Sequence, residues 1–193
     1  MSETAVFLAA GVAALAVLYG IRLAARILSG HEAGAPATAA EDNAGVVVQP
    51  PFIYLGFLVA AVVLEVILPS PVDAVFHRTR YALGLMLAVT AVVIVFAAAR
   101  RFRAAGTNIP PHLPTTALAV DGVYAHTRNP MYLAMTLLYA GLAIAAGSLW
   151  AIVLLALLLW VINAAVVARE EHYLERKFGD AYREYKTRVR RWV

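Results

Sequence analysis

The sequence predicts an all-α integral membrane protein: a helical bundle of about five transmembrane helices with a C-terminal helical hairpin and a cytoplasmic amphipathic tail helix. The first observation is composition, since 62% of the 193 residues are hydrophobic, only 15% are charged, and the mean hydropathy is +0.74. Soluble globular domains are about half apolar and roughly a quarter charged. The second observation is that apolar runs reach the roughly 20 residues needed to cross a bilayer. The third is a one-sided distribution of positive charge.

Five membrane spans are expected. They run from Thr4 to Leu28, Phe52 to Leu68, Tyr81 to Ala99, Met131 to Ala146 and Leu149 to Ala168. The last two come from one apolar run that is too long for a single crossing of ordinary tilt. Gly147 and Ser148 lie in the middle of that run and predict a tight turn, so the run becomes a hairpin of two helices.

The positions of positive charges predict the orientation. No cationic region precedes the first span, and Arg22 and Arg26 lie at its far end, which is the charge order of an uncleaved anchor. With the amino terminus outside, the inside segments hold 14 of the 16 Lys and Arg residues. Only Arg78 and Arg80 fall outside, and a four-span topology is the alternative that accommodates them. We expect an integral protein of a bacterial inner membrane with its C-terminus in the cytoplasm.

The chain divides into two parts. Residues 1–99 hold three spans and a linker at 29–51 that is rich in Ala, Gly, Pro and acidic residues. Residues 100–193 form the expected catalytic region, made of a proline-stiffened loop, the hairpin at 131–168 and the tail at 169–193. We expect the loop and the tail to be two walls of a pocket.

The tail has a stripe of apolar and aromatic residues at helical spacing, surrounded by basic residues. The stripe consists of Leu174, Phe178, Tyr182, Tyr185 and Val189. Such a helix is expected to lie on the anionic cytoplasmic leaflet. Gly179 is expected to end one helix, and Asp180 to cap the next.

Several classes of chemistry are excluded or disfavoured. The chain has no cysteine, so disulfides, thiolate metal sites and cysteine nucleophiles are absent. His112, His126 and His172 lack metal-ligand spacing, so no metal site is expected. His126 or His172 remains a candidate base near neutral pH. We expect no nucleic-acid partner.

Two separated motifs stand on either side of the hairpin. The first comprises Gly122-x-Tyr124, Arg128-Asn-Pro-x-Tyr132 and Gly141; the second is Glu170-Glu171-x-x-Leu174-x-x-x-Phe178-Gly179-x-x-Tyr182-x-x-Tyr185. Together they resemble the isoprenylcysteine carboxyl methyltransferase family and its relatives, the phospholipid N-methyltransferases. The resemblance covers roughly Gly106 to the end of the chain.

This resemblance implies a multi-span enzyme that uses S-adenosylmethionine, held at the cytoplasmic face by the loop before the hairpin and the tail after it. Two positions depart from the family's pattern. Asn129 stands where the family usually has His, and Thr116 stands where many relatives have His. The prenylcysteine substrate is therefore not carried over.

The chemistry of S-adenosylmethionine assigns expected roles to these residues. Its carboxylate needs a donor, its amine needs acceptors, and its sulfonium needs aromatic faces or carboxylates. Arg128 is expected to serve the carboxylate, Glu170 or Glu171 the amine, and Tyr124 or Tyr132 the sulfonium.

Pro130 in the first helical turn is expected to leave the preceding amides free for an anion or for adenine. Adjacent helical residues point about 100° apart, so only one of Glu170 and Glu171 is expected to face the site squarely.

The expected catalytic residues are Arg128, Glu170 and Glu171. The expected cofactor-binding residues are Leu118, Gly122, Tyr124, Arg128, Asn129, Pro130, Tyr132, Glu170 and Glu171. Simpler roles exist for some of them, since an arginine can extend to lipid phosphates and tyrosines can mark the membrane interface. Asn163 is expected either to line the pocket floor or to make an interhelical hydrogen bond.

The sequence thus predicts an S-adenosylmethionine-dependent methyltransferase acting on a lipid-like or small apolar acceptor at the cytoplasmic membrane face. Two alternatives remain open: an NADPH-dependent enzyme of the sterol or steroid reductase type, and a non-catalytic lipid-binding membrane protein. The acceptor atom and the oligomeric state stay open.

Overall fold

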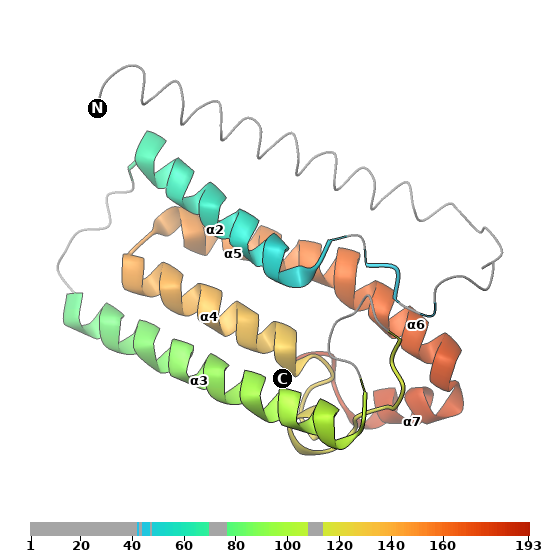
Figure 1. Ribbon diagram of the computed structural model, residues 1–193. Helices are drawn as coiled ribbons and strands as arrows, with labels where there is room; N and C mark the ends of the chain where they lie inside the picture. The colour runs from blue at the N-terminus through green and yellow to red at the C-terminus, as the bar shows by residue number, and fades with distance from the viewer. Residues whose placement is uncertain (1–41, 43, 47, 70–76, 108–113) are drawn as a thin grey trace.

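The computed structural model describes residues 42, 44–46, 48–69, 77–107 and 114–193 (Figure 1). All regular secondary structure in these ranges is helical, which confirms the all-α prediction. The first predicted span, Thr4 to Leu28, and most of the linker lie outside the described residues. They are not considered further.

Helices occupy each predicted span within the described ranges. They are α2 (Pro50–Ile67), α3 (His77–Ala104), the 3₁₀ turn η2 (Gly122–Ala125), α4 (Pro130–Ala146), α5 (Leu149–Ile162), the π-helical segment η3 (Asn163–Val167), α6 (Ala168–Phe178) and α7 (Asp180–Arg188). Three of these stretches are long and apolar enough to cross a membrane: α2, residues 78–104 of α3, and the continuous rod from α5 through α6. Helix α4 is apolar but shorter. The protein is therefore an integral membrane protein.

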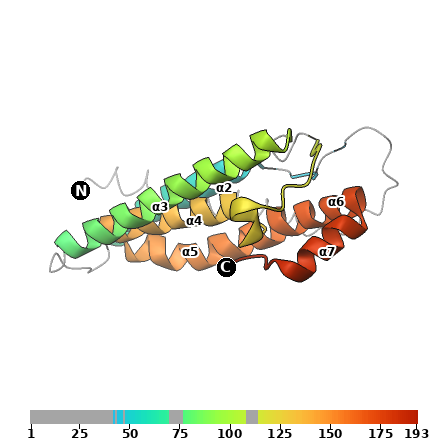
Figure 2. The same cartoon turned by 90° about the horizontal axis from the view of Figure 1, so that it is seen from below.

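The predicted turn divides the hairpin at Gly147 and Ser148. Gly147 ends α4 with a φ of 66°, a left-handed conformation that favours glycine. Ser148 caps α5, because its hydroxyl accepts a hydrogen bond of 3.2 Å from the amide of Ala151. The two residues reverse the chain direction, so α5 returns alongside α4 (Figures 1 and 2).

Helices α3 and α4 pack closely along their lengths, while α2 packs on α5. Two glycines face each other where α3 crosses α4: a Cβ on Gly84 would lie 2.6 Å from the carbonyl oxygen of Gly141. A Cβ on Gly141 would lie 2.8 Å from the carbonyl oxygen of Gly84. The absence of both side chains lets the two backbones approach, as at other close membrane-helix crossings.

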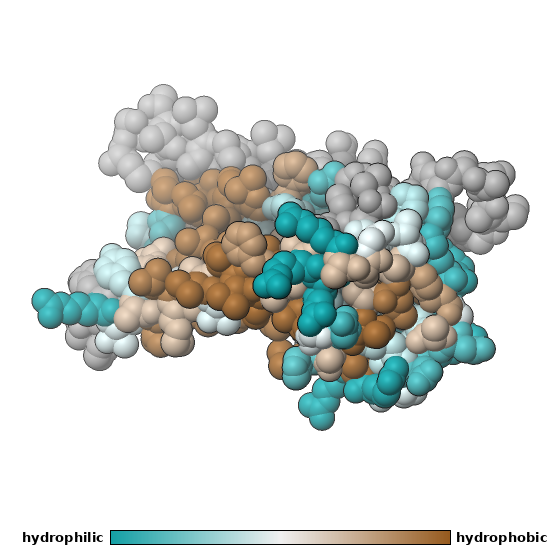
Figure 3. Space-filling model, turned by 60° about the horizontal axis from the view of Figure 1, so that its bottom comes forward, coloured by the Kyte–Doolittle hydropathy of each residue, from teal (hydrophilic) through white to brown (hydrophobic). Residues whose placement is uncertain are grey.

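The outer faces of α2 and α3 carry exposed apolar side chains, including Phe52, Leu85 and Phe96. Figure 3 shows hydrophobic residues over the body of the bundle and hydrophilic residues toward the end that carries α6 and α7. Such a distribution suits a bundle surrounded by lipid along its length.

The apolar stripe of the tail faces the protein. Tyr182, Tyr185 and Val189 are buried, and they pack with Leu118 of the preceding loop. This differs from the expectation that the stripe lies on the lipid leaflet, because the loop offers it an apolar surface within the protein itself. Gly179 does separate α6 from α7, with a φ of 53°. Asp180 is the first residue of α7 rather than its cap.

Candidate functional site

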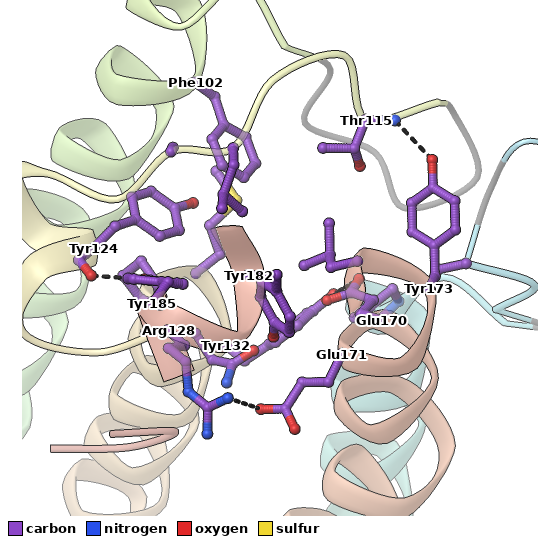
Figure 4. Close-up of a pocket in the computed structure, with 18 of the residues that line it drawn as sticks. Phe102, Thr115, Tyr124, Arg128, Tyr132, Glu170, Glu171, Tyr173, Tyr182 and Tyr185 are labelled. Carbon is purple, nitrogen blue, oxygen red and sulfur yellow. Dashed lines mark hydrogen bonds and ion pairs between the residues drawn. The ribbon is translucent and has the colours of Figure 1, made fainter. Parts of the chain in front are cut away.

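A cavity of about 450 Å³ lies at one end of the bundle, where α2 and α4 begin and the last turns of α3 meet α6 and α7 (Figure 4). Its volume is within the range of about 300–1,000 Å³ typical of small-molecule and cofactor sites. Most of its wall is apolar, with a few polar groups at one edge. The loop before α4 and the tail helix form two of its walls, as the sequence predicts.

The structure brings eight of the nine predicted cofactor-binding residues to this cavity. They are Leu118, Tyr124, Arg128, Asn129, Pro130, Tyr132, Glu170 and Glu171. Gly122 lies outside it, at the start of η2, with a φ of 62°. A side chain there would collide with the guanidinium of Arg101, so this glycine shapes the loop rather than lining the cavity.

The 3₁₀ turn η2 places the Tyr124 ring in the cavity wall. The ring stacks on Phe102 of α3, with centroids 5.0 Å apart and an interplanar angle of 13°. The hydroxyl of Tyr185 donates a hydrogen bond of 2.6 Å to the Tyr124 carbonyl, which joins α7 to this loop (Figure 4).

Burial disfavours ionisation of the tyrosine hydroxyls in the cavity wall. It raises the pKa of Tyr124 well above its ordinary value, and it raises the pKa of Tyr185 to about 12. Both phenols are therefore protonated at neutral pH.

Glu171 is held by two arginines. Arg191 binds it with both ends of its guanidinium, Nε at 3.0 Å from Oε1 and Nη2 at 2.5 Å from Oε2. Nη1 of Arg128 lies 3.1 Å from Oε1 of the same carboxylate. The Arg128 and Glu171 side chains are only 11% and 10% exposed, so their charges lie largely out of water.

Arg128 retains unused hydrogen-bonding capacity. Its Nε and Nη1 are buried and make no hydrogen bond to any group in the described part of the chain. Nη1 is close to Glu171, but the pair is not aligned for a hydrogen bond. Buried donors without acceptors are costly, and such donors in a cavity wall indicate a site for an acceptor from a ligand.

Glu170 has a different partner. The Tyr132 hydroxyl donates a short hydrogen bond to Oε1 of Glu170. The Tyr54 hydroxyl in turn contacts the Tyr132 carbonyl at 3.1 Å and Thr136 Oγ1 at 2.8 Å, which fixes the start of α4 against α2. Both glutamates therefore line the cavity, although only one was expected to face it. The two side chains point in different directions, so Glu170 binds Tyr132 whereas Glu171 binds the two arginines.

The amides before Pro130 are not free, contrary to the sequence-based expectation. The Arg128 amide donates to the Arg190 carbonyl at 3.0 Å, and the Asn129 amide donates to Thr127 Oγ1 at 3.2 Å. The last residues of the chain therefore use the Arg128 amide, and a side chain of the loop itself uses the Asn129 amide.

Sequence reasoning missed several residues of the site. Arg191 resembled any other basic residue of the tail, and no pattern distinguished it. It does not line the cavity but binds Glu171, which does, whereas Phe102 and Tyr173 line the cavity without having been singled out. Tyr182 and Tyr185 also line the cavity. Their helical spacing identified them as part of the apolar stripe but did not indicate that they belong to the site.

Asn163 does not line the cavity. Its side-chain oxygen accepts a hydrogen bond of 3.1 Å from Trp192 Nε1, and its amide nitrogen donates to the Leu159 carbonyl at 2.9 Å. Neither expected role is found in the described part of the chain: Asn163 makes no hydrogen bond to a helix outside its own rod, and it holds the final residues of the chain against η3.

The fold and the cavity define the class of this protein: a helical membrane protein with a largely apolar cavity at one end of its bundle. The phospholipid methyltransferase family matches residues 79–181, just over half of the chain, and the chain belongs to that family. The matched region includes α4, α5, α6 and most of the cavity wall.

Two relatives share part of the sequence. An uncharacterized protein of Haemophilus influenzae is 44% identical over 63 residues, which is 33% of this chain and all of that protein. The protein-S-isoprenylcysteine O-methyltransferase of Schizosaccharomyces pombe is 33% identical over 72 residues, which is 37% of this chain and 30% of that enzyme. No solved structure matches the chain. Family membership supports a membrane methyltransferase and confirms the resemblance seen in the two motifs.

Proposed function

We propose that this protein is an S-adenosylmethionine-dependent methyltransferase that acts on a lipid-like or small apolar acceptor at the cytoplasmic face of the membrane. The observation that carries the proposal is the convergence of Arg128, Glu170 and two tyrosine rings on one largely apolar cavity (Figure 4). Membership of the phospholipid methyltransferase family supports the reaction class.

The residues around the cavity fit this cofactor. The buried Nε and Nη1 of Arg128 make no hydrogen bond in the described chain, although Nη1 is ion-paired with Glu171, and the cofactor's carboxylate would accept hydrogen bonds from them. Glu170 offers a carboxylate to the amine. The neutral rings of Tyr124 and Tyr132 offer faces to a sulfonium. The donor, when bound, supplies its methyl group from that sulfonium.

The protein's own contribution is mainly positioning and exclusion of water. Methyl transfer is a direct displacement, so the acceptor must lie in line with the breaking bond. Arg128 and Glu170 would fix the amino-acid end of the donor, while the stacked pair of Tyr124 and Phe102 would shield the cavity from water. Glu170, with Tyr132 as its hydrogen-bond donor, is also placed to take a proton from an acceptor.

The apolar wall supports an apolar acceptor. Val95 of α3, Met131 and Met135 of α4, and Pro50 of α2 line the part of the cavity nearest the membrane-spanning segments. An amphiphile would enter from the bilayer, with its reactive head toward Glu170. The name of the yeast relative specifies a prenylated cysteine, but Asn129 and Thr116 depart from that pattern, so we do not assign that acceptor.

A thermal-shift experiment on the detergent-purified protein tests the function. S-adenosylmethionine and its demethylated product S-adenosylhomocysteine are expected to raise the melting temperature, with a stabilisation that grows as the logarithm of one plus their concentration over Kd, whereas NADPH is not. Stabilisation by NADPH alone would indicate the reductase alternative. No stabilisation by any of the three would favour the non-catalytic lipid-binding alternative.

The orientation and domain division are part of the proposal. We place the cavity and the C-terminus at the cytoplasmic side of a bacterial inner membrane, with residues 100–193 as the catalytic region and residues 1–99 as supporting helices. The clustered Arg100, Arg101 and Arg103 at the cavity end of α3 support this orientation. Because the chain has no cysteine, a single cysteine at position 190 can be labelled selectively. Labelling of intact cells by an impermeant maleimide would contradict the orientation.

A further inference from the structure

Residues 189–193, called here the C-terminal strap, are joined to three parts of the site. The Arg191 carbonyl accepts hydrogen bonds from Thr127 Oγ1 and Asn129 Nδ2, each at 3.0 Å. The Arg190 carbonyl accepts the Arg128 amide, and Trp192 donates to Asn163 in η3. The strap therefore fixes the backbone on both sides of the Arg191 side chain.

The same strap holds the loop that carries Arg128. Its main-chain carbonyls bind the loop at positions 127–129, while the Arg191 side chain reaches Glu171 of α6. The C-terminal strap thus sets the position of Arg128. Its Arg191 side chain also pairs with Glu171, the carboxylate to which Arg128 would otherwise bind. No other described side chain makes an ion pair with Glu171.

The charges in this cluster are unequal. Two guanidinium groups, Arg128 and Arg191, face the single carboxylate of Glu171. Arg191 engages both carboxylate oxygens in the paired geometry that is strongest for these groups. Arg128 lies near one oxygen without an aligned hydrogen bond, so it keeps one positive charge for another anion.

We propose that Arg191 is a positioning residue: by satisfying both oxygens of Glu171, it leaves the Arg128 guanidinium available to bind the carboxylate of the cofactor's amino-acid end. This inference rests on the proposed function. Without Arg191, Glu171 would add hydrogen bonds to its existing ion pair with Arg128, and Arg128 would have less capacity for the ligand. Glu170, which is bound to Tyr132 instead, keeps its place for the amine.

The test compares two ligands that differ only at the amino-acid end. Isothermal titration of the full-length, detergent-purified protein uses S-adenosylhomocysteine and 5′-methylthioadenosine, which lacks the amino-acid carboxylate and amine. Arg191→Gln is expected to weaken S-adenosylhomocysteine about tenfold, the loss of roughly one charge-assisted hydrogen bond. The affinity for 5′-methylthioadenosine should stay within about twofold of that of the parent protein.

Arg190→Gln is the matched control. It removes the same charge from the neighbouring residue, whose side chain is exposed and whose main-chain contact to Arg128 is kept. It should change neither affinity. Arg191→Lys keeps the charge but not the paired geometry, so its affinity for S-adenosylhomocysteine should lie between those of the parent and Arg191→Gln.

A rescue separates positioning from simple loss of structure. Adding Glu171→Gln to Arg191→Gln removes the carboxylate that competes for Arg128, so part of the lost affinity for S-adenosylhomocysteine should return. Unchanged affinity in Arg191→Gln, or an equal loss for both ligands, would overturn the positioning role. If the parent protein binds neither ligand, the proposed function fails instead. If Arg191→Gln does not fold, Arg191→Lys and the double variant carry the test.

Discussion

The two ends of the bundle both contain polar side chains beside apolar helices, but they use them differently. At the turn end, Ser148 donates to Glu65 at 2.8 Å, and Trp150 Nε1 donates to the Leu68 carbonyl at 2.7 Å. These contacts join α2 to the start of α5. At the cavity end, Arg128 has buried nitrogens, Nε and Nη1, that make no hydrogen bond in the described chain.

The difference shows how a structural polar cluster is distinguished from a binding site in a membrane protein. Polar groups near lipid are costly unless they are paired, and Ser148, Glu65 and Trp150 at the turn end are paired within the protein. The cavity end has an empty volume together with incomplete pairing, and only this combination indicates a ligand. Polarity alone would have made Glu65 as good a candidate as Glu170.

The largest effect is expected from removing the ligand-binding charge. Arg128→Gln should weaken the binding of S-adenosylhomocysteine by about 2–5 kcal/mol, at least roughly 30-fold, because the carboxylate of the ligand loses a buried charged partner. Glu65→Gln at the turn end should leave the affinity unchanged while lowering the melting temperature. Titration calorimetry measures the first effect and thermal unfolding the second. Equal affinities for Arg128→Gln and the parent would remove the distinction between the two ends.

A smaller effect, on stability, is expected at the close contact between α3 and α4, which lies between the two ends of the bundle. Gly141→Ala places a Cβ 2.8 Å from the Gly84 carbonyl and 3.1 Å from Leu87 Cβ, so it should cost about 1–3 kcal/mol of stability. Gly56→Ala in α2 is the matched control, since a Cβ there meets nothing within 4 Å. Thermal unfolding in detergent should show a lower melting temperature for Gly141→Ala alone.

Tyr132→Phe tests the partner of the second carboxylate. It removes the hydroxyl that binds Glu170 but keeps the ring that lines the cavity. The expected loss is about 1.5 kcal/mol of ligand binding, roughly tenfold, since one hydrogen bond to a charged group is lost. Tyr139→Phe changes a buried hydroxyl of the same helix that has no hydrogen-bond partner in the described chain. This control should bind S-adenosylhomocysteine like the parent, and equal losses in both variants would contradict a specific role for Tyr132.

The smallest effect is expected at the turn. Ser148→Ala removes the cap of α5 and one hydrogen bond to Glu65, which should cost about 1 kcal/mol of stability. The affinity for S-adenosylhomocysteine should not change, because the turn lies at the other end of the hairpin. A loss of affinity comparable to that of Tyr132→Phe would show that the two ends are coupled rather than separate.

Much of the fold could be predicted because membrane helices depend on simple patterns. Apolar runs located α2 to α5, and Gly147 with Ser148 located the hairpin turn. The two motifs located the cavity, because a hairpin necessarily returns the chain from Tyr132 to Glu170 at the same end of the bundle.

The remaining features depend on contacts between distant segments, and spacing along the chain does not encode them. The direction of the tail stripe depended on whether the loop at Leu118 offered it an apolar surface. The hydrogen bond of the Arg128 amide depended on where Arg190 folds back. Arg191 could not be distinguished from its basic neighbours, because its importance comes from a partner 20 residues away.

The π-helical segment η3, at Asn163–Val167, lies a few residues before the two glutamates. A π turn accommodates one extra residue, so it determines which way the side chains of α6 point relative to those of α5. Deleting one residue there would rotate α6 by about 100° relative to α5 and carry Glu171 away from the strap. The number of residues between the hairpin turn and Glu170 and Glu171 is therefore as necessary for the cavity as the two glutamates themselves.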